Sequence, residues 1–86
     1  MEIFETNKFK RLRKKVKEKG EIIKLKEAIL KIIKEPLAGK KLKSEFLDLR
    51  AYRYFVKNQE RRLLICKIEK DKMILLSFGP REGIYK

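Results

Sequence analysis

The chain has 86 residues, too few for two separate hydrophobic cores, so we predict a single domain over residues 1–86. Apolar residues make up 43% of it, and no apolar run reaches the ~18 residues of a membrane helix, which excludes a disordered chain and a membrane span. The 25 Lys and Arg residues against 12 Asp and Glu give a formal net charge of +13, which predicts a polyanionic partner (RNA or DNA) or an acidic protein.

The N-terminal part is expected to form a short strand and a basic helix. Met1 to Glu5 alternates in the manner of a strand, and either Thr6 or Asn7 can cap the helix that follows. Lys8 to Lys19 carries one narrow apolar stripe among lysines and arginines, and Gly20 is expected to end it. The basic face predicts a nucleic-acid contact, and the competing interpretation is a solvated face of an amphipathic helix.

A second helix and a loop are predicted next. Glu21 to Lys34 has apolar residues at helical spacing, and Pro36 disfavours helical geometry at the residue before it. The short link between the helices predicts an antiparallel hairpin. Leu37 to Glu45 is expected to be a connecting loop.

The second half of the chain predicts three strands. They are Leu47 to Lys57, Arg61 to Glu69 and Lys72 to Phe78, joined by a polar turn at residues 57–60 and a tight turn at Lys70 and Asp71. Short loops favour sequential antiparallel pairing. The predicted fold is therefore α+β, with a two-helix hairpin on a small antiparallel sheet in the order β-α-α-β-β-β.

The only cysteine and the first residues predict where the protein works. Cys66 lies in an apolar strand pattern, excludes an intramolecular disulfide and is expected to be a buried small residue in a reducing compartment. Met1 to Glu5 lacks the apolar segment of a signal peptide. We expect a cytoplasmic protein that does not bind membranes.

Several kinds of chemistry are excluded by composition. The chain has no histidine, so a Ser/His or Cys/His catalytic system cannot form. We expect no metal site, because one cysteine and scattered carboxylates do not make a ligand cluster. No glycine-rich loop has the spacing that cradles a nucleotide, so no cofactor is predicted.

Chemistry on a phosphodiester remains open. Arginine binds phosphate through paired planar hydrogen bonds, and RNA supplies its own nucleophile in the 2′-hydroxyl. Tyr85 could exchange a proton only if neighbouring arginines lowered its pKa, and Arg81 is the nearest candidate in sequence. The alternative interpretation is that these residues form salt bridges and packing contacts in a basic RNA-binding fold.

Short motifs follow one another in a set order through the second half of the chain. They are Leu42-Lys43-Ser44, Arg53-Tyr54-Phe55-Val56, Arg62-Leu63-Leu64-Ile65, Lys67-Ile68-Glu69, Ile74-Leu75-Leu76-Ser77-Phe78 and Arg81-Glu82-Gly83-Ile84-Tyr85. In this order they resemble the RelE/ParE superfamily of bacterial and archaeal type II toxins. The resemblance covers essentially the whole chain and implies a RelE-like fold.

The resemblance also implies an activity. RelE-type members cleave mRNA in the ribosomal A site without a metal and leave a cyclic phosphate. By position, Arg53 would help to activate the nucleophile, and Arg62 and Arg81 would bind and stabilise the phosphate. Tyr85 would orient the reacting groups or exchange a proton with them.

Partners follow from the same resemblance. They are a cognate antitoxin, the ribosome with its mRNA, and operator DNA only as a complex with the antitoxin. The further residues predicted to contact RNA are Lys10, Arg11, Lys14 and Lys15 in the first helix, and Arg50, Lys57 and Arg61 in the strands.

One departure from the family pattern leaves other functions open. RelE-type enzymes often carry a second basic residue two positions after the first, and Phe55 stands there in this chain, with Lys57 as a candidate substitute. A ParE-like toxin that acts on DNA gyrase, without cleaving RNA, is one alternative. An inactive RNA-binding relative is the other.

Overall fold

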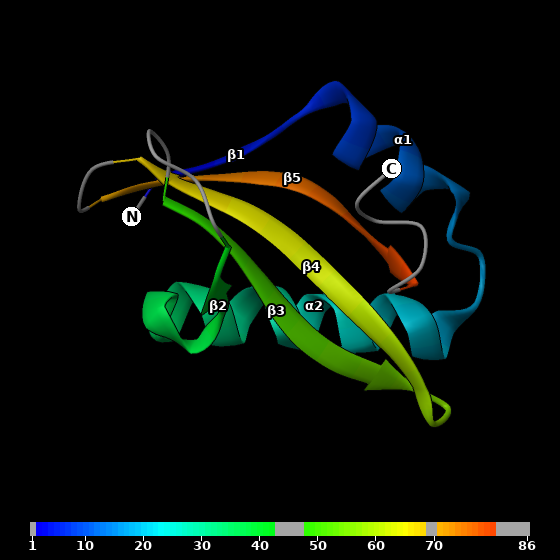
Figure 1. The fold of residues 1–86 in the computed structure, drawn as a ribbon. Helices are drawn as coiled ribbons and strands as arrows, with labels where there is room; N and C mark the ends of the chain where they lie inside the picture. The colour runs from blue at the N-terminus through cyan, green and yellow to red at the C-terminus, as the bar shows by residue number, and fades with distance from the viewer. Residues whose placement is uncertain (1, 43–47, 69–70, 81–86) are drawn as a thin grey trace.

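The computed structural model describes residues 2–42, 48–68 and 71–80. Within these ranges the elements are β1 (Glu2–Glu5), α1 (Asn7–Lys15), α2 (Lys19–Lys34), the 3-10 helix η1 (Pro36–Ala38), β2 (Lys40–Lys41), β3 (Asp48–Val56), β4 (Gln59–Ile68) and β5 (Lys72–Pro80) (Figure 1). The strands form one sheet in the order β1-β5-β4-β3-β2. The predicted α+β layout is confirmed.

Strand pairing agrees with the predicted meander and adds a parallel pair to it. The β3–β4 and β4–β5 pairs are antiparallel, as predicted. β1 instead pairs in parallel with β5, so the sheet is mixed and not wholly antiparallel. A parallel pair needs a long connection, and the one between β1 and β5 contains both helices and the strands β2 to β4.

The short strand β2 lies within the segment that was predicted to be a loop. Lys40 and Lys41 pair with Ala51 and Arg50 of β3. The backbone comes close here, since a Cβ added to Gly39 would lie 3.2 Å from Cβ of Arg50. A larger residue at position 39 would require its neighbours, Arg50 first, to shift by a few tenths of an ångström.

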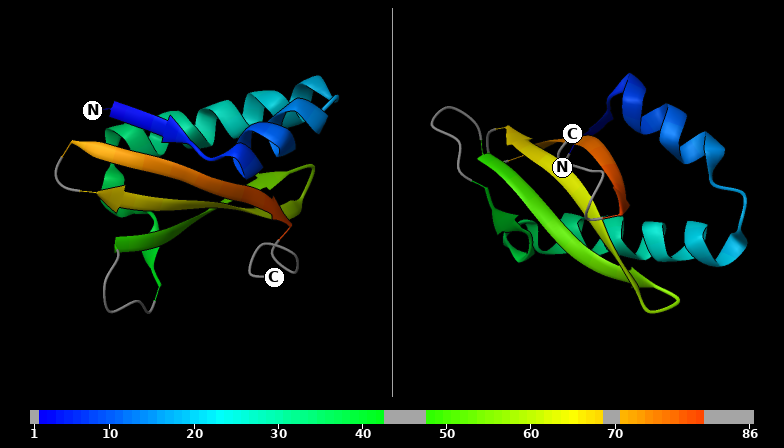
Figure 2. Two further views of the ribbon diagram at one scale, coloured as in Figure 1. Left: turned by 90° about the horizontal axis from the view of Figure 1, so that it is seen from above. Right: turned by 45° about the vertical axis from the view of Figure 1, so that its right-hand side comes forward.

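Both helices lie on one face of the sheet, and within the described ranges the other face carries no helix (Figure 2). We call it the helix-free face. α1 contacts β5, and α2 contacts β3. The core lies between these layers, where Phe9, Ile32, Leu63, Ile65 and Met73 have no exposed surface. The Phe9 ring meets Phe78 edge to face, with centroids 5.1 Å apart. Helix burial thus follows the predicted apolar stripes.

The start of α1 is as predicted, but its end is not. The Thr6 hydroxyl accepts a hydrogen bond from the Phe9 N–H at 3.0 Å and donates one to the Leu76 carbonyl at 2.9 Å, so it caps the helix and ties it to β5. Helix α1 ends at Lys15, and Gly20, predicted as its stop, lies in the first turn of α2. Val16 is extended and packs against the core. A tertiary contact therefore ends α1 before the glycine is reached.

The hairpin between β3 and β4 is tighter than predicted. Lys57 and Asn58 both have positive φ angles, 49° and 66°, which is the geometry of a two-residue turn that matches strand twist. Gln59 and Glu60, expected in the turn, are the first residues of β4. This shift places Glu60 inside the sheet, opposite Phe55.

Candidate functional site

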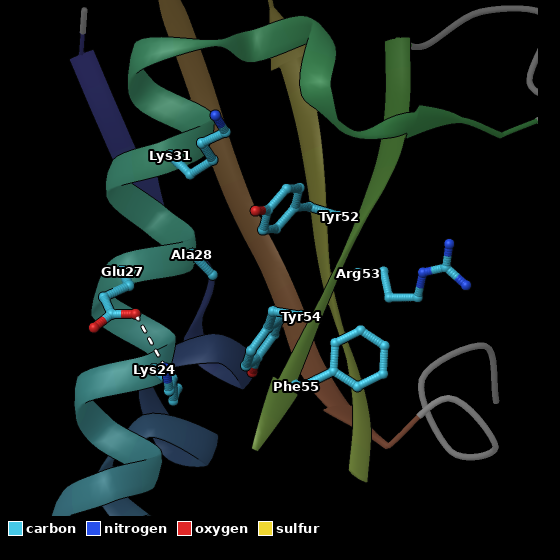
Figure 3. A pocket seen from close by; sticks show the side chains of 8 residues that line it. All are labelled: Lys24, Glu27, Ala28, Lys31, Tyr52, Arg53, Tyr54 and Phe55. Carbon is cyan, nitrogen blue, oxygen red and sulfur yellow. Dashed lines mark ion pairs between the residues drawn. The ribbon is translucent and has the colours of Figure 1, made fainter. Parts of the chain in front are cut away.

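Strand alternation divides the arginines of β3 and β4 between the two faces of the sheet. Arg53 and Arg62 are direct partners across the two strands. Figure 3 shows Arg53 pointing away from α2, whereas Tyr52 and Tyr54 point toward it, so Arg53 and Arg62 belong to the helix-free face. Arg61, adjacent to Arg62 in sequence, lies on the covered face.

On the helix-free face, Arg53 and Arg62 hold one carboxylate between them. Nη1 of Arg53 lies 3.3 Å from Oε1 of Glu60, and Nη2 of Arg62 lies 3.1 Å from Oε2. Nε of Arg62 adds a third contact to Oε2 at 3.3 Å. Two like charges directly opposite each other would repel, and the carboxylate removes that repulsion. The guanidinium groups therefore converge on a space the size of one anion.

The electrostatics of this cluster keep Glu60 ionised. Partial burial acts to raise the pKa of Glu60, but hydrogen bonds from Arg62 and Arg53 outweigh it and hold the pKa below its ordinary value. The Arg62 side chain is 15% exposed, whereas that of Arg53 is 60% exposed. Arg53 is therefore the more accessible of the two to a ligand.

A hollow of about 310 Å³ opens beside the two arginines. Lys40 of β2 lines it together with Arg53 and Arg62, and the rest of its wall is Ala38, Ala51 and Tyr52. Lys40 pairs with Ala51, which lies two residues before Arg53 in β3, so Lys40 is on the same face of the sheet as Arg53 and Arg62. Sequence reasoning missed Lys40, because a two-residue strand leaves no periodic signal.

Gly79 continues the row of Arg53 and Arg62 onto β5. It is the direct partner of Arg62 and its φ is 152°; among the described residues, no heavy atom lies within 4 Å of a Cβ added there. The missing side chain leaves open space beside Arg62, and the backbone angle favours glycine. Arg81 and Tyr85 lie outside the described residues, so their predicted roles stay predictions.

The other residues predicted to contact RNA do not join this cluster. Nε of Arg61 lies 3.4 Å from Oε1 of Glu21 on α2. Arg50 donates to the Gly39 carbonyl at 3.0 Å, and its Nε lies 3.0 Å from Oδ1 of Asp48 without hydrogen-bond geometry. These arginines have structural partners.

Lysines and the basic helix are placed apart from the cluster as well. Lys57 is hydrogen-bonded to Glu18, which raises the pKa of the lysine. The remaining predicted contacts are exposed on α1, on the helix-covered side of the sheet; they are Lys10, Arg11, Lys14 and Lys15. RNA binding through this set remains a prediction, and it would use a surface separate from Arg53 and Arg62.

Buried ionisable groups elsewhere are structural. Burial raises the pKa of Tyr54 to about 12, with Arg61 lowering it and Glu21 raising it. Cys66 is buried as predicted, and burial together with Asp48 raises the pKa of its thiol. Neither group is poised to react near neutral pH.

A second hollow follows β3 on its other side. It measures about 470 Å³ and lies between α2 and β3 (Figure 3). Its charged residues include Lys24 and Glu27, which form an ion pair at 3.6 Å.

Among the residues that the structure describes, no three His, Cys, Asp or Glu side chains gather as metal ligands. Likewise, no helix within those ranges is long and apolar enough to cross a membrane.

The fold described above indicates a class of protein. A two-helix layer on a small mixed sheet is the architecture expected of a RelE/ParE superfamily toxin. The chain belongs to one family of that class: the model described as "ParE-like toxin of type II bacterial toxin-antitoxin system" matches residues 3–86. A search among curated proteins gives no match. Family membership implies an antitoxin as partner.

Proposed function

We propose that this toxin is a metal-independent endoribonuclease that cleaves mRNA on the ribosome and is neutralised by its antitoxin. The observation that supports this most is the shared carboxylate of Glu60, which Arg53 and Arg62 contact through separate oxygens at 3.3 and 3.1 Å. A phosphodiester presents two non-bridging oxygens in a similar arrangement. Two arginines that already hold one anion can hold the scissile phosphate in its place.

The reaction needs charge stabilisation at that phosphate. The 2′-oxygen of the RNA attacks phosphorus, the bond from phosphorus to the 5′-oxygen breaks, and a 2′,3′-cyclic phosphate remains. Arg53 and Arg62 stabilise the negative charge that grows on the non-bridging oxygens. Lys40 supplies a third cation in the same hollow, in a chain that has Phe55 where relatives often have a basic residue. Arg81 would add to this set.

Two protons must also move. Glu60 is the carboxylate that the arginine pair contacts, and those contacts hold its pKa below the ordinary value, so it is ionised at neutral pH. It can accept the proton of the 2′-hydroxyl once an arginine has left it, because losing that contact raises its pKa and makes it a stronger base. To do so it must release at least one arginine to the phosphate, and the exposed Arg53 is the better candidate. Tyr85 would deliver the proton to the departing 5′-oxygen, as the family resemblance implies.

A gyrase-directed toxin is the second candidate. Phe55 favours it, because an exposed aromatic ring in place of a basic residue suits a protein contact. The family description also names ParE. In that case, the toxin would break no bond itself, and substitutions at Arg62 would not affect RNA.

The experiment compares two neighbouring arginines of equal charge. Arg62→Ala should lower mRNA cleavage on translating ribosomes by about 10²-fold or more, since it removes donors to the phosphate. Arg61→Ala, on the opposite face, should retain nearly full cleavage. Thermal unfolding of both variants shows whether each is folded.

Three results would count against the proposal. Equal cleavage by both variants would remove the site from the helix-free face. Intact mRNA with the parent toxin, together with trapped gyrase cleavage complexes in a supercoiling assay, would select the gyrase alternative. Harmless expression without an antitoxin would indicate an inactive relative.

A further inference from the structure

Phe55 is one of the exposed aromatic residues in the part of the chain that the structure describes. It is 53% exposed, on the helix-free side of β3 (Figure 3). Its direct partner across the sheet is Glu60, and Arg53 lies two residues earlier on the same face. Strand residues two apart are separated by about 7 Å, the scale of one nucleotide. The ring therefore lies next to the residue whose carboxylate Arg53 and Arg62 share, at the position proposed for the phosphate.

We propose that Phe55 is the platform on which an unpaired RNA base stacks while Arg53 and Arg62 hold the adjoining phosphate. This rests on the proposed endoribonuclease function and names its substrate as single-stranded RNA. Aromatic rings beside arginines on an open sheet surface are a common way to bind single-stranded nucleic acid. The +13 charge of the chain supplies long-range attraction, and the ring supplies a short-range contact.

The ring also selects against duplexes. A base in a double helix has both of its faces covered by neighbours and cannot lie flat on a side chain of the sheet. An unstacked base in an extended strand can. The proposal thus accounts for Phe55 where relatives often have a second cation: affinity lost from one charge is regained by stacking.

The chain offers a clean optical test, because it contains no tryptophan. Phe55→Trp introduces one indole at the proposed platform. Titration with a short single-stranded RNA, 2′-O-methylated so that it cannot be cleaved, should quench the indole fluorescence to saturation. The same sequence as duplex RNA should bind by charge but leave the fluorescence nearly unchanged.

Phe4→Trp is the matched control. Phe4 is 48% exposed and pairs with Ile74, at the edge strand β1 and away from the arginines. RNA should bind this variant equally well without quenching its indole. In addition, Phe55→Ala should weaken single-stranded RNA binding by about 5- to 150-fold, and Phe55→Tyr should restore it.

The outcomes separate this inference from the function on which it rests. If Phe55→Trp is not quenched but Arg62→Ala still reduces binding and cleavage, stacking is wrong and the nuclease stands. If Arg62→Ala changes neither RNA binding nor cleavage, both proposals fall. If Phe55→Ala weakens binding of the antitoxin but not of RNA, Phe55 is a protein contact, which overturns the inference.

Discussion

The two faces of the sheet carry the same kinds of residues and use them in different ways. On the covered face, Arg61 is tied to Glu21 of α2 beside the buried Tyr54. On the helix-free face, Arg53 and Arg62 share the carboxylate of Glu60, which belongs to the same hairpin, and they border a hollow. Net charge does not distinguish these arginines. They are distinguished by the alternation of side chains along each strand and by the face on which the helices lie.

The largest expected effect separates binding from chemistry on the helix-free face. Glu60→Gln keeps the size of the side chain but removes its charge and its ability to accept a proton. We expect cleavage to fall by about 10²- to 10⁴-fold, the range for a lost general base. RNA binding should tighten, because the arginines lose a competing anion. Faster cleavage would mean that Glu60 acts only as an inhibitor.

The covered face should carry most of the stability. Phe9 has no exposed surface and packs on Phe78, so Phe9→Ala should lower the free energy of unfolding by about 3–5 kcal/mol. Phe4→Ala should lower the free energy of unfolding far less, because the Phe4 ring is exposed on the helix-free face. Urea unfolding of both variants measures the difference. Similar losses would show that the helix-free face is packed as tightly as the covered one.

Tyr54 gives the covered face a signature in pH. Its pKa is raised to about 12 from an ordinary value of 10.0, so its stabilising effect is complete below pH 10 and is lost as the pH rises toward 12. Two pKa units correspond to about 2–3 kcal/mol. Tyr54→Phe should remove this part of the alkaline loss, seen by comparing urea unfolding at pH 9 and pH 11.5. Parallel pH profiles would contradict the burial of the phenol.

The smallest effect concerns the backbone beside Arg62. Gly79 has a φ of 152°, so Gly79→Ala should lower stability by about 1–2 kcal/mol, although no atom of the described residues lies near the added methyl group. It should lower cleavage as well, because it narrows the open space next to Arg62. A variant with unchanged stability would show that this angle is relaxed easily.

Much of this fold could be predicted from the sequence because its signals are local. The apolar stripe through Phe9, the cap at Thr6 and the alternation of β3 to β5 each depend on near neighbours. The parallel pairing of β1 and the early end of α1 could not, since both depend on contacts distant in sequence.

The candidate site was only half predictable, for a related reason. Arg53 and Arg62 are the positions that the resemblance to the RelE/ParE superfamily implies, and antiparallel pairing brings them together. The sequence predicts Glu60 in a turn, and only the two-residue geometry of Lys57 and Asn58 places it in the sheet. Both faces carry apolar residues, so the pattern of β4 does not reveal whether Arg61 or Arg62 faces the helices.

A double-mutant cycle on cleavage tests the shared anion site most directly. Arg53→Ala, Arg62→Ala and the double variant should be strongly non-additive, because removing either arginine already spoils the grip on one phosphate. The cycle of Arg61→Ala with Arg62→Ala should be additive, since those side chains lie on opposite faces. Additive losses for Arg53 and Arg62 would contradict the account, for they would mean that the two guanidinium groups act on separate parts of the substrate.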